Sequence, residues 1–253
     1  MDLEHLAELE CPAIRERPDG QPLTYQKWGK LLFMHWRIEE SELRPLIPEQ
    51  LEIDSFDGTA WIGIIPFTMW DIRAFPPYLP AVPGLSSAHE LNVRTYVHYD
   101  RVPGVWFFSL DCNSTAAVLA ARGFYHLPYY NADIDLEQSG NTIQYSLKRT
   151  DEPAARFESS WNIGESVPFA HPDSLEFFLT ERYCLYAEND GELYRARIYH
   201  QPWPLQKATM NSYDSTMIEA LGLKSLGGEA VLNYAEAIDV EIWGIKKVSE
   251  ARP

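Results

Sequence analysis

Cysteine is scarce in this sequence of 253 residues, and the three that occur, Cys11, Cys112 and Cys184, are odd in number and far apart. Their spacing excludes a disulfide-stabilised scaffold and is typical of a protein from a reducing compartment. Residues 1–5 are acidic and lack the apolar segment of a secretory signal. No apolar run approaches the roughly 20 residues that a membrane-spanning helix needs. We therefore expect a cytoplasmic protein that has no membrane partner.

Basic residues are also few, because 21 lysines and arginines stand against 37 aspartates and glutamates, a formal net charge of −16. Nucleic acid is therefore not an expected partner, since its phosphates require a basic surface. Hydrophobic residues make up 45% of the chain and aromatic residues 13%, which predicts a folded core. No change in composition marks a domain boundary. We predict an N-terminal extension, residues 1–22, and a single domain, residues 23–253; no oligomeric state can be read from the sequence.

Several motifs of well-known sites are missing. The sequence has no Gly-x-Gly-x-x-Gly and no P-loop pattern, which excludes the common nucleotide sites. It has no Gly-x-Ser-x-Gly elbow and no His-Glu-x-x-His pair, and its seven histidines are scattered. We therefore expect neither a cofactor nor a metal ion.

The middle of the chain carries the clearest periodic pattern. Residues 91–97 alternate between apolar and polar side chains, which predicts a β-strand. One face of this strand presents Glu90, Asn92, Arg94 and Tyr96. A polar face of this kind either lines an interior site or forms a solvated surface with cross-strand ion pairs.

Other segments predict further strands and a few helices. Pro66 interrupts an apolar strand, which indicates a bulge or a sheet edge. Asp190-Gly191 between two strand-like runs predicts a hairpin. A helix is expected over residues 116–122, capped by Asn113 or Ser114 and ended by Gly123. Many short strands with few helices predict an α+β, mainly antiparallel β fold.

Two sets of segments resemble known families. Residues 43–54, Leu-Arg-Pro-Leu-Ile-Pro-Glu-Gln-Leu-Glu-Ile-Asp, resemble a segment near the start of acetoacetate decarboxylases. Residues 90–97, 103–111, 121–122, 127–129, 180–183 and 200–205 more closely resemble the YqjF-like family of uncharacterised bacterial proteins, which is grouped in the acetoacetate decarboxylase-like superfamily. The resemblance covers about residues 25–250. It implies a cone-shaped antiparallel β-barrel with a central cavity and short flanking helices.

The resemblance also implies where a catalytic lysine would lie. Acetoacetate decarboxylases use a Schiff-base lysine, whose pKa is lowered by an adjacent lysine in a desolvated cavity. The matching spacing here contains Arg122 and Pro128, but Tyr129 and Tyr130 stand in place of the two lysines. Decarboxylation through an imine at this position is therefore not expected, because tyrosine forms no imine.

The other groups that the resemblance implies are only partly present. Glu90 matches a glutamate that faces the family's site, whereas a second glutamate falls on Thr68 and an arginine falls on Gly29. Lys207 and Lys246 are the candidates for a relocated lysine. The alternative for both is an ordinary surface lysine.

Our first hypothesis is an interior site for a small carboxylate or carbonyl compound. Glu90 would act as general acid or base, and Tyr129 would donate a hydrogen bond to a carbonyl oxygen. The expected ligand-binding residues are Arg94, Arg122, Asn92, Tyr96 and Tyr130.

Two other hypotheses stay open at this point. In the second hypothesis, the protein is a non-catalytic module that binds an apolar or aromatic ligand. In the third, it is a structural or interaction protein whose own side chains fill the cavity. In these cases Arg122 is a cation that stabilises a helix C-terminus, and the tyrosines form an aromatic cluster. The sequence names neither the ligand nor a reaction.

Overall fold

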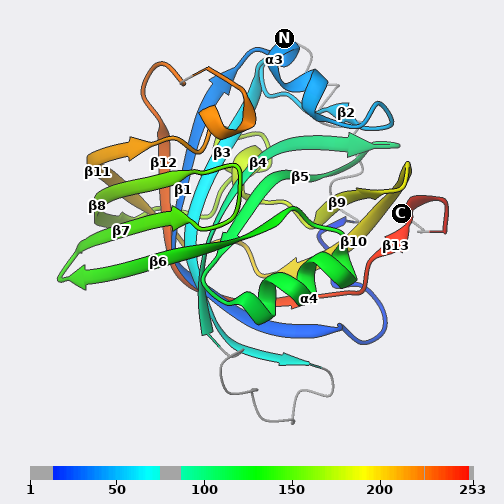
Figure 1. Cartoon of the computed structure of the whole chain (residues 1–253), viewed down its shortest axis with the longest axis horizontal. Helices are drawn as coiled ribbons and strands as arrows, with labels where there is room; N and C mark the ends of the chain where they lie inside the picture. Colours follow the sequence, from blue (N-terminus) through cyan, green and yellow to red (C-terminus); the bar gives the residue numbers. More distant parts are fainter. Residues whose placement is uncertain (1–13, 75–86, 225, 251–253) are drawn as a thin grey trace.

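The computed structural model describes residues 14–74, 87–224 and 226–250, which form one sheet of thirteen strands with short helices around it (Figure 1). The strands are β1 (Thr24–Ile38), β2 (Glu52–Ile53), β3 (Ala60–Ala74), β4 (Ser87–Tyr99), β5 (Val102–Cys112), β6 (Tyr129–Ser139), β7 (Thr142–Arg149), β8 (Arg156–Ser166), β9 (Cys184–Asn189), β10 (Glu192–His200), β11 (Leu205–Ser215), β12 (Val231–Ile242) and β13 (Lys246–Lys247). The helices are α3 (Glu40–Leu43), α4 (Thr115–Tyr125), α5 (Leu175–Thr180) and the 3-10 helices η1 (Arg44–Leu46), η2 (Glu219–Leu221) and η3 (Val248–Glu250). The predicted fold, mainly antiparallel β with few short helices, is confirmed. Most of the predicted N-terminal extension, residues 1–13, lies outside the described residues.

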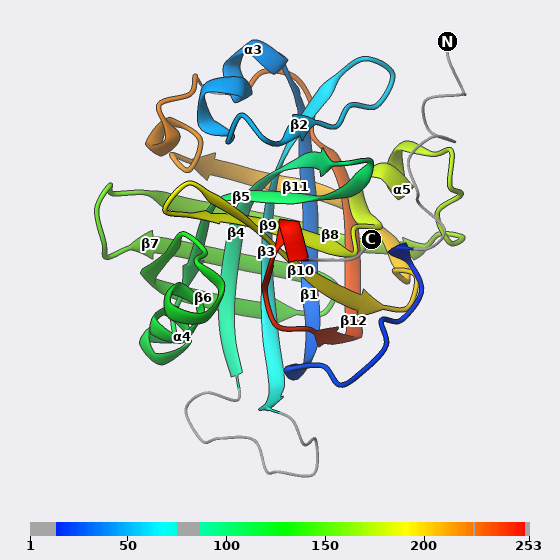
Figure 2. The same cartoon turned by 90° about the vertical axis from the view of Figure 1, so that its right-hand side faces the viewer.

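The sheet closes on itself because β5 and β12 each have partners on both sides and change partner along their length. β5 pairs with β4 on one side; on the other it pairs in parallel with β9 at residues 105–106 and with β6 at residues 110–112. β12 pairs with β11 at residues 233–235 and with β10 at residues 240–242. The strands β12, β1, β3, β4 and β5 are therefore shared by two rings. One ring is completed by β6, β7, β8 and β11, and the other by β9 and β10, which lie on opposite sides of the shared strands (Figures 1 and 2).

Each ring encloses its own hydrophobic core, and the shared strands contribute to both. In β4, Leu91 and Val93 point into the core of the ring that contains β6, β7 and β8. Ala88 and Tyr96 point to the other side, into the core bounded by β9 and β10. Alternate side chains of a strand face opposite sides of a sheet, so Glu90, Asn92 and Arg94 share the face of Ala88 and Tyr96. The predicted polar face of this strand is thus an interior face.

Pro66 lies within a continuous strand, β3, opposite a disruption in β1. The β1–β3 register runs from Gly29 opposite Thr68 to Met34 opposite Ile64, with an irregularity between the two pairs. Lys30, inside this gap, has a φ of 47°. Proline cannot donate a hydrogen bond to a neighbouring strand, so the bulge lies where no donor is available. Of the two alternatives predicted at Pro66, a bulge or a sheet edge, the structure shows the bulge.

Two local predictions have different outcomes. Asp190 and Gly191, with φ values of 53° and 78°, connect β9 to β10 as the predicted hairpin turn. Ser114 caps α4, since its Oγ accepts a hydrogen bond from the Ala117 N–H at 3.4 Å. However, α4 continues through Gly123 to Tyr125 and is capped by His126, whose φ of 55° is left-handed. The prediction that Gly123 ends this helix is wrong, because helical φ and ψ are also open to glycine.

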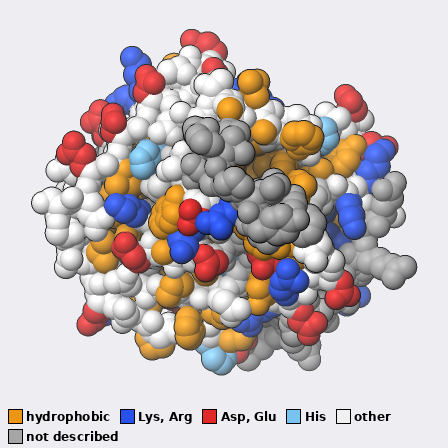
Figure 3. Space-filling model, turned by 90° about the horizontal axis from the view of Figure 1, so that it is seen from below, with side chains coloured by type: hydrophobic (Ala, Val, Ile, Leu, Met, Phe, Trp, Pro, Cys, Tyr) orange, Lys and Arg blue, Asp and Glu red, His pale blue; other side chains and the backbone are white. Residues whose placement is uncertain are grey.

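The formal net charge is −16, but the surface carries side chains of both signs. On the face shown in Figure 3, lysine and arginine side chains lie among aspartates and glutamates, with scattered hydrophobic groups between them. Within the described residues, no helix is long and apolar enough to cross a membrane.

Candidate functional site

The centre of the candidate site is a buried carboxyl group next to a phenol. Glu90 on β4 is 2% exposed, and the Tyr129 hydroxyl, at the start of β6, donates to its Oε2 at 2.8 Å. Burial raises the pKa of Glu90 from 4.5 to about 8, although hydrogen bonds from Tyr129 and Asn92 oppose this rise. Glu90 is therefore mostly protonated at neutral pH. A protonated carboxyl group can donate a hydrogen bond as well as accept one.

The groups around Glu90 are also neutral proton donors. Cys112 lies opposite Glu90 in the β4–β5 register, and burial together with Glu90 raises the pKa of its thiol to about 12. Burial raises the pKa of Tyr125, at the end of α4, to about 12 as well. The Tyr125 hydroxyl has no hydrogen-bond partner among the described residues. From β7, the Tyr145 hydroxyl donates to the backbone oxygen of Glu90 at 2.9 Å and fixes this part of β4.

Arg94 and Tyr96 belong to a second polar group, farther along the same face of β4. The Tyr96 hydroxyl donates to the Leu179 carbonyl at 2.7 Å and lies 2.6 Å from His35 Nε2. Arg94 Nη2 donates to the same carbonyl at 3.1 Å, at the end of α5. Burial and the Arg94 charge hold the pKa of His35 well below 6.5, so this imidazole is neutral.

The two polar groups on β4 are separated along the strand. Four residues separate Glu90 from Arg94, which corresponds to about 13 Å along an extended strand. The Arg94 guanidinium is directed to Tyr96 and thus away from Glu90. Asn92 lies between them on the same face. The buried atoms Asn92 Oδ1 and Arg94 Nε have no hydrogen-bond partner among the described residues, and Arg94 itself is only half-buried.

The structure places Arg122 and Tyr130 outside both groups. Arg122, in the last turn of α4, donates through Nε to the Tyr129 carbonyl and through Nη2 to Asp151, both at 2.8 Å. Its side chain is 42% exposed. The Tyr130 ring lies under the Arg149 guanidinium at 4.0 Å, so neighbouring residues of β6 face opposite sides of the sheet. The structure therefore brings Tyr129, but neither Arg122 nor Tyr130, to Glu90.

No side chain larger than hydrogen fits where the resemblance expects an arginine. A Cβ on Gly29 would lie 2.1 Å from the Glu236 carbonyl oxygen and 2.6 Å from the Trp70 ring. Thr68, the neighbour of Gly29 on β3, forms a 2.9 Å hydrogen bond with His89 Nδ1. This end of the face therefore lacks both charged groups that the resemblance implies.

All seven lysines lie in the described part of the chain, and none is buried. Lys207 is 65% exposed and pairs with Glu165 at 2.7 Å. Lys246 is exposed, and its neighbour Lys247 lies 3.8 Å from Glu192. Because a lysine of low pKa needs a desolvated setting, neither candidate has the environment of an imine-forming residue. Among the described residues, no group of histidine, cysteine, aspartate and glutamate side chains is arranged to hold a metal ion.

Four residues of these two polar groups are absent from the sequence-based site: His35, Cys112, Tyr125 and Tyr145. Cys112 was identifiable in principle, since the antiparallel pairing of β4 with β5 places it opposite Glu90. His35 comes from β1, 61 positions before its partner Tyr96, and no local pattern joins the two.

Comparison with known proteins agrees with this architecture. Residues 25–239 match the family DUF2071, described as an uncharacterized conserved protein. Over 233 residues the chain is 42% identical to the uncharacterized protein YqjF of Bacillus subtilis (strain 168), a match that covers 92% of this chain and 95% of that protein.

Solved structures of much lower identity share the fold. The enduracididine biosynthesis enzyme MppR complexed with pyruvate aligns with a TM-score of 0.65 at 11% identity, over 93% of this chain and 94% of that one. Acetoacetate decarboxylase from Legionella pneumophila aligns with a TM-score of 0.60 at 13% identity, over 96% and 94% of the chains. At these identities the likeness shows the fold alone. The chain thus has the acetoacetate decarboxylase-like fold, and it belongs to the YqjF-like family of uncharacterized proteins, DUF2071.

Proposed function

We propose that this protein binds a small carbonyl compound or carboxylate next to Glu90, without an imine-forming lysine. The observation that carries the proposal is the 2.8 Å hydrogen bond between the buried Glu90 carboxyl and the Tyr129 hydroxyl. A buried acid and a phenol with raised pKa values present neutral donors to a ligand oxygen. Glu90 is buried and Tyr129 is half-buried, so the Tyr129 side of this pair lies nearer to the solvent.

Each residue has a defined role in this proposal. Glu90 is the general acid or base, and Tyr129 donates to the carbonyl oxygen of the ligand. Asn92, whose Oδ1 is buried without a partner, offers a further polar contact on the same face. Arg94 anchors a carboxylate, but only of an acid long enough to reach it from Glu90. A ligand of the size of pyruvate reaches one of these ends, not both.

The names of the structural relatives support this class of ligand. The enzyme MppR is complexed with pyruvate in one structure and with the condensation product of pyruvate and imidazole 4-carboxaldehyde in another, and two further relatives are acetoacetate decarboxylases. Tyr129 and Tyr130 stand where the resemblance places the decarboxylase lysines, which favours non-covalent binding in this chain. The buried, unpaired thiols of Cys112 and Cys184 favour a cytoplasmic location.

A non-catalytic or structural role is the second candidate, and one observation favours it. Arg94 and Tyr96 both donate to the Leu179 carbonyl, so their hydrogen bonds hold α5 against β4. In that case the polar face of β4 serves mainly to attach this helix. Binding of a ligand next to Glu90 would then be weak or absent.

The test is calorimetric titration with acetone, pyruvate and 6-oxoheptanoate, using wild type, Glu90→Gln and Arg94→Met. Glu90→Gln should weaken all three ligands by about tenfold, because it replaces the acidic proton with an amide. Arg94→Met should weaken only 6-oxoheptanoate, whose carboxylate lies far from its carbonyl. Arg122→Gln is the matched control and should bind like wild type. If folded Glu90→Gln and Arg94→Met both bind like wild type, the proposed site is wrong.

A further inference from the structure

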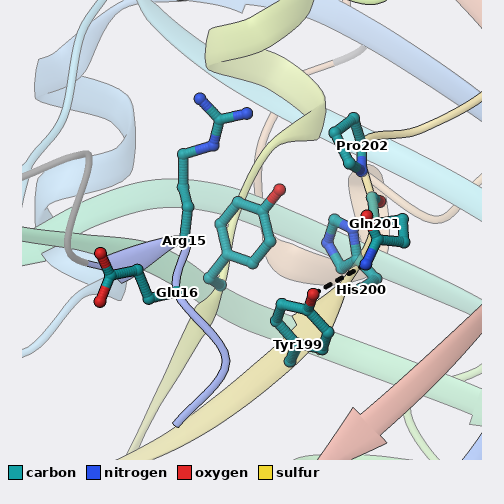
Figure 4. A pocket seen from close by; sticks show the side chains of 7 residues that line it. Arg15, Glu16, Tyr199, His200, Gln201 and Pro202 are labelled. Carbon is teal, nitrogen blue, oxygen red and sulfur yellow. Dashed lines mark hydrogen bonds between the residues drawn. The ribbon is translucent and has the colours of Figure 1, made fainter.

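A second cavity lies outside the Glu90 region, where the start of the described chain meets the end of β10. It has a volume of about 290 Å³. Arg15 lies on one side of the cavity and Tyr199 and Gln201 lie on the other (Figure 4), and Tyr183 also lines it. This volume is near the lower end of the range for small-molecule sites, which suits a ligand with a single ring.

The floor of this cavity is rigid and aromatic. The Tyr183 ring stacks on His200, with ring centroids 4.5 Å apart and an interplanar angle of 20°. The Tyr183 hydroxyl donates to Glu181, and the other carboxylate oxygen of Glu181 accepts from the backbone N–H of Trp203 at 2.9 Å. Glu181 is 5% exposed, and each of its carboxylate oxygens accepts a hydrogen bond from one of these donors. Three of the lining residues are aromatic rings, and Pro202 adds an apolar surface.

Arg15 supplies a cation that no carboxylate neutralises within the described residues. Its guanidinium lies 4.9 Å from the centre of the Phe177 ring, and its charge partly opposes the rise that burial causes in the pKa of Tyr183. Figure 4 shows the carboxylate of Glu16 directed away from the other lining side chains. By contrast, Arg17, two residues later, is paired with Glu241 at 2.8 Å. Among the described residues, the charge of Arg15 is therefore left for an anionic ligand.

The opposite wall of the cavity carries the Tyr199 hydroxyl, whose proton can be donated to a ligand. Gln201 Nε2 donates to the Tyr199 hydroxyl at 2.8 Å, so the hydroxyl proton of Tyr199 points elsewhere. We propose that this cavity binds a small aromatic carboxylate, whose carboxylate pairs with Arg15 and whose ring packs against Tyr183, Tyr199 and Pro202. A planar acid satisfies the cation and the apolar rings together, which a phosphate or an aliphatic amine would not.

This cavity is distinct from the Glu90 site, and its assignment does not depend on the function proposed there. The Trp203 ring packs 5.0 Å from His200 on one side and 5.0 Å from Phe33 on the other. Phe33 in turn lies under Arg94, with the guanidinium 5.6 Å from the ring centre. Trp203 and Phe33 thus separate the cavity from the polar face of β4.

The probe is benzoate, titrated into the full-length protein by calorimetry, with benzamide as its uncharged counterpart. Arg15→Gln should weaken benzoate by about tenfold, because it removes a charge-assisted hydrogen bond. Arg17→Gln removes the same charge two residues away and should change benzoate affinity less than twofold, within about 0.4 kcal/mol. Glu90→Gln should also leave it unchanged, which separates this site from the one proposed above. Benzamide should bind wild type about as weakly as benzoate binds Arg15→Gln.

A second measurement keeps the proposal testable if Arg15→Gln does not fold. In the wild-type protein, benzoate should shift the NMR signals of Tyr199 and His200 in proportion to its binding. The proposal is overturned if benzoate does not saturate wild type by about 10 mM, if Arg15→Gln binds it as Arg17→Gln does, or if the shifted signals lie elsewhere.

Discussion

The Tyr129 hydroxyl lies 2.8 Å from Glu90 Oε2 and joins two residues that are 39 positions apart in the chain. The contact forms because β5 pairs with β4 along one edge and with β6 at its end, which brings the first residue of β6 to the polar face of β4. It places a phenol against a carboxyl group that burial keeps protonated at neutral pH.

Glu90→Gln should change how stability depends on pH. The pKa of Glu90 is about 8 in the folded protein and 4.5 when exposed, so between these values the folded state holds a proton that the unfolded state releases. Burial of Glu90 therefore lowers the free energy of unfolding by nothing below pH 4.5. This loss grows as pH rises and reaches about 4–5 kcal/mol above pH 8. Urea unfolding at pH 5 and pH 8.5 should show that Glu90→Gln loses less stability than wild type. The exposed control Glu137→Gln should follow wild type; a Glu90→Gln profile parallel to wild type would show that Glu90 is ionised in the fold.

Tyr129→Phe should raise the pKa of Glu90 still further. The Tyr129 hydrogen bond stabilises the ionised carboxylate and holds the pKa of Glu90 down, so its loss favours the proton by about one unit. Carbon-13 NMR of glutamate-labelled protein, followed across pH, measures this pKa directly. Tyr130→Phe is the matched control, because Tyr130 faces Arg149 on the other side of β6. Equal Glu90 pKa values in the two variants would contradict the assigned contact.

Several of these relationships were readable from the sequence, and others were not. The alternation of residues 91–97 correctly placed Glu90 and Tyr96 on one face of a strand, because strand periodicity is a local property. The same reasoning could not decide whether that face was solvated, since the answer depends on β9 and β10, nearly a hundred residues later. Arg122 shows the limit most clearly. Its spacing to Tyr129 matches the family pattern, but its side chain ends on Asp151, a partner that local sequence does not reveal.

Arg149→Met should strongly destabilise the fold. Arg149 Nε and Nη2 bind the two carboxylate oxygens of Asp111 at 2.6 and 2.8 Å, and both side chains are almost fully buried. Removing the arginine leaves a buried carboxylate unpaired, which costs about 3–5 kcal/mol in the free energy of unfolding. Urea denaturation measures the loss. The exposed pair of Arg156 and Asp214 supplies the control, and Arg156→Met should have a much smaller effect. Similar losses in the two variants would mean that Arg149 and Asp111 are solvated.

Gly29→Ala should also destabilise the protein, by about 3 kcal/mol, because backbone of β12 and the Trp70 ring occupy the space of a Cβ. Gly123→Ala is the opposite case. Nothing lies within 4 Å of its added Cβ, and it is inside α4, so the change should stabilise by about 0.5–1 kcal/mol. Thermal unfolding of the two variants measures the expected loss and the expected gain of stability. A Gly29→Ala protein as stable as wild type would show that the structure has room for a Cβ at this position.

The most direct test of the central claim is a crystal structure of the protein soaked in pyruvate. We predict an intact, unattached pyruvate with an oxygen about 3 Å from the Glu90 carboxyl and the Tyr129 hydroxyl. Density continuous with the Nζ atom of any lysine, or a Glu90–Tyr129 pair enclosed entirely by protein side chains with pyruvate absent, would contradict it.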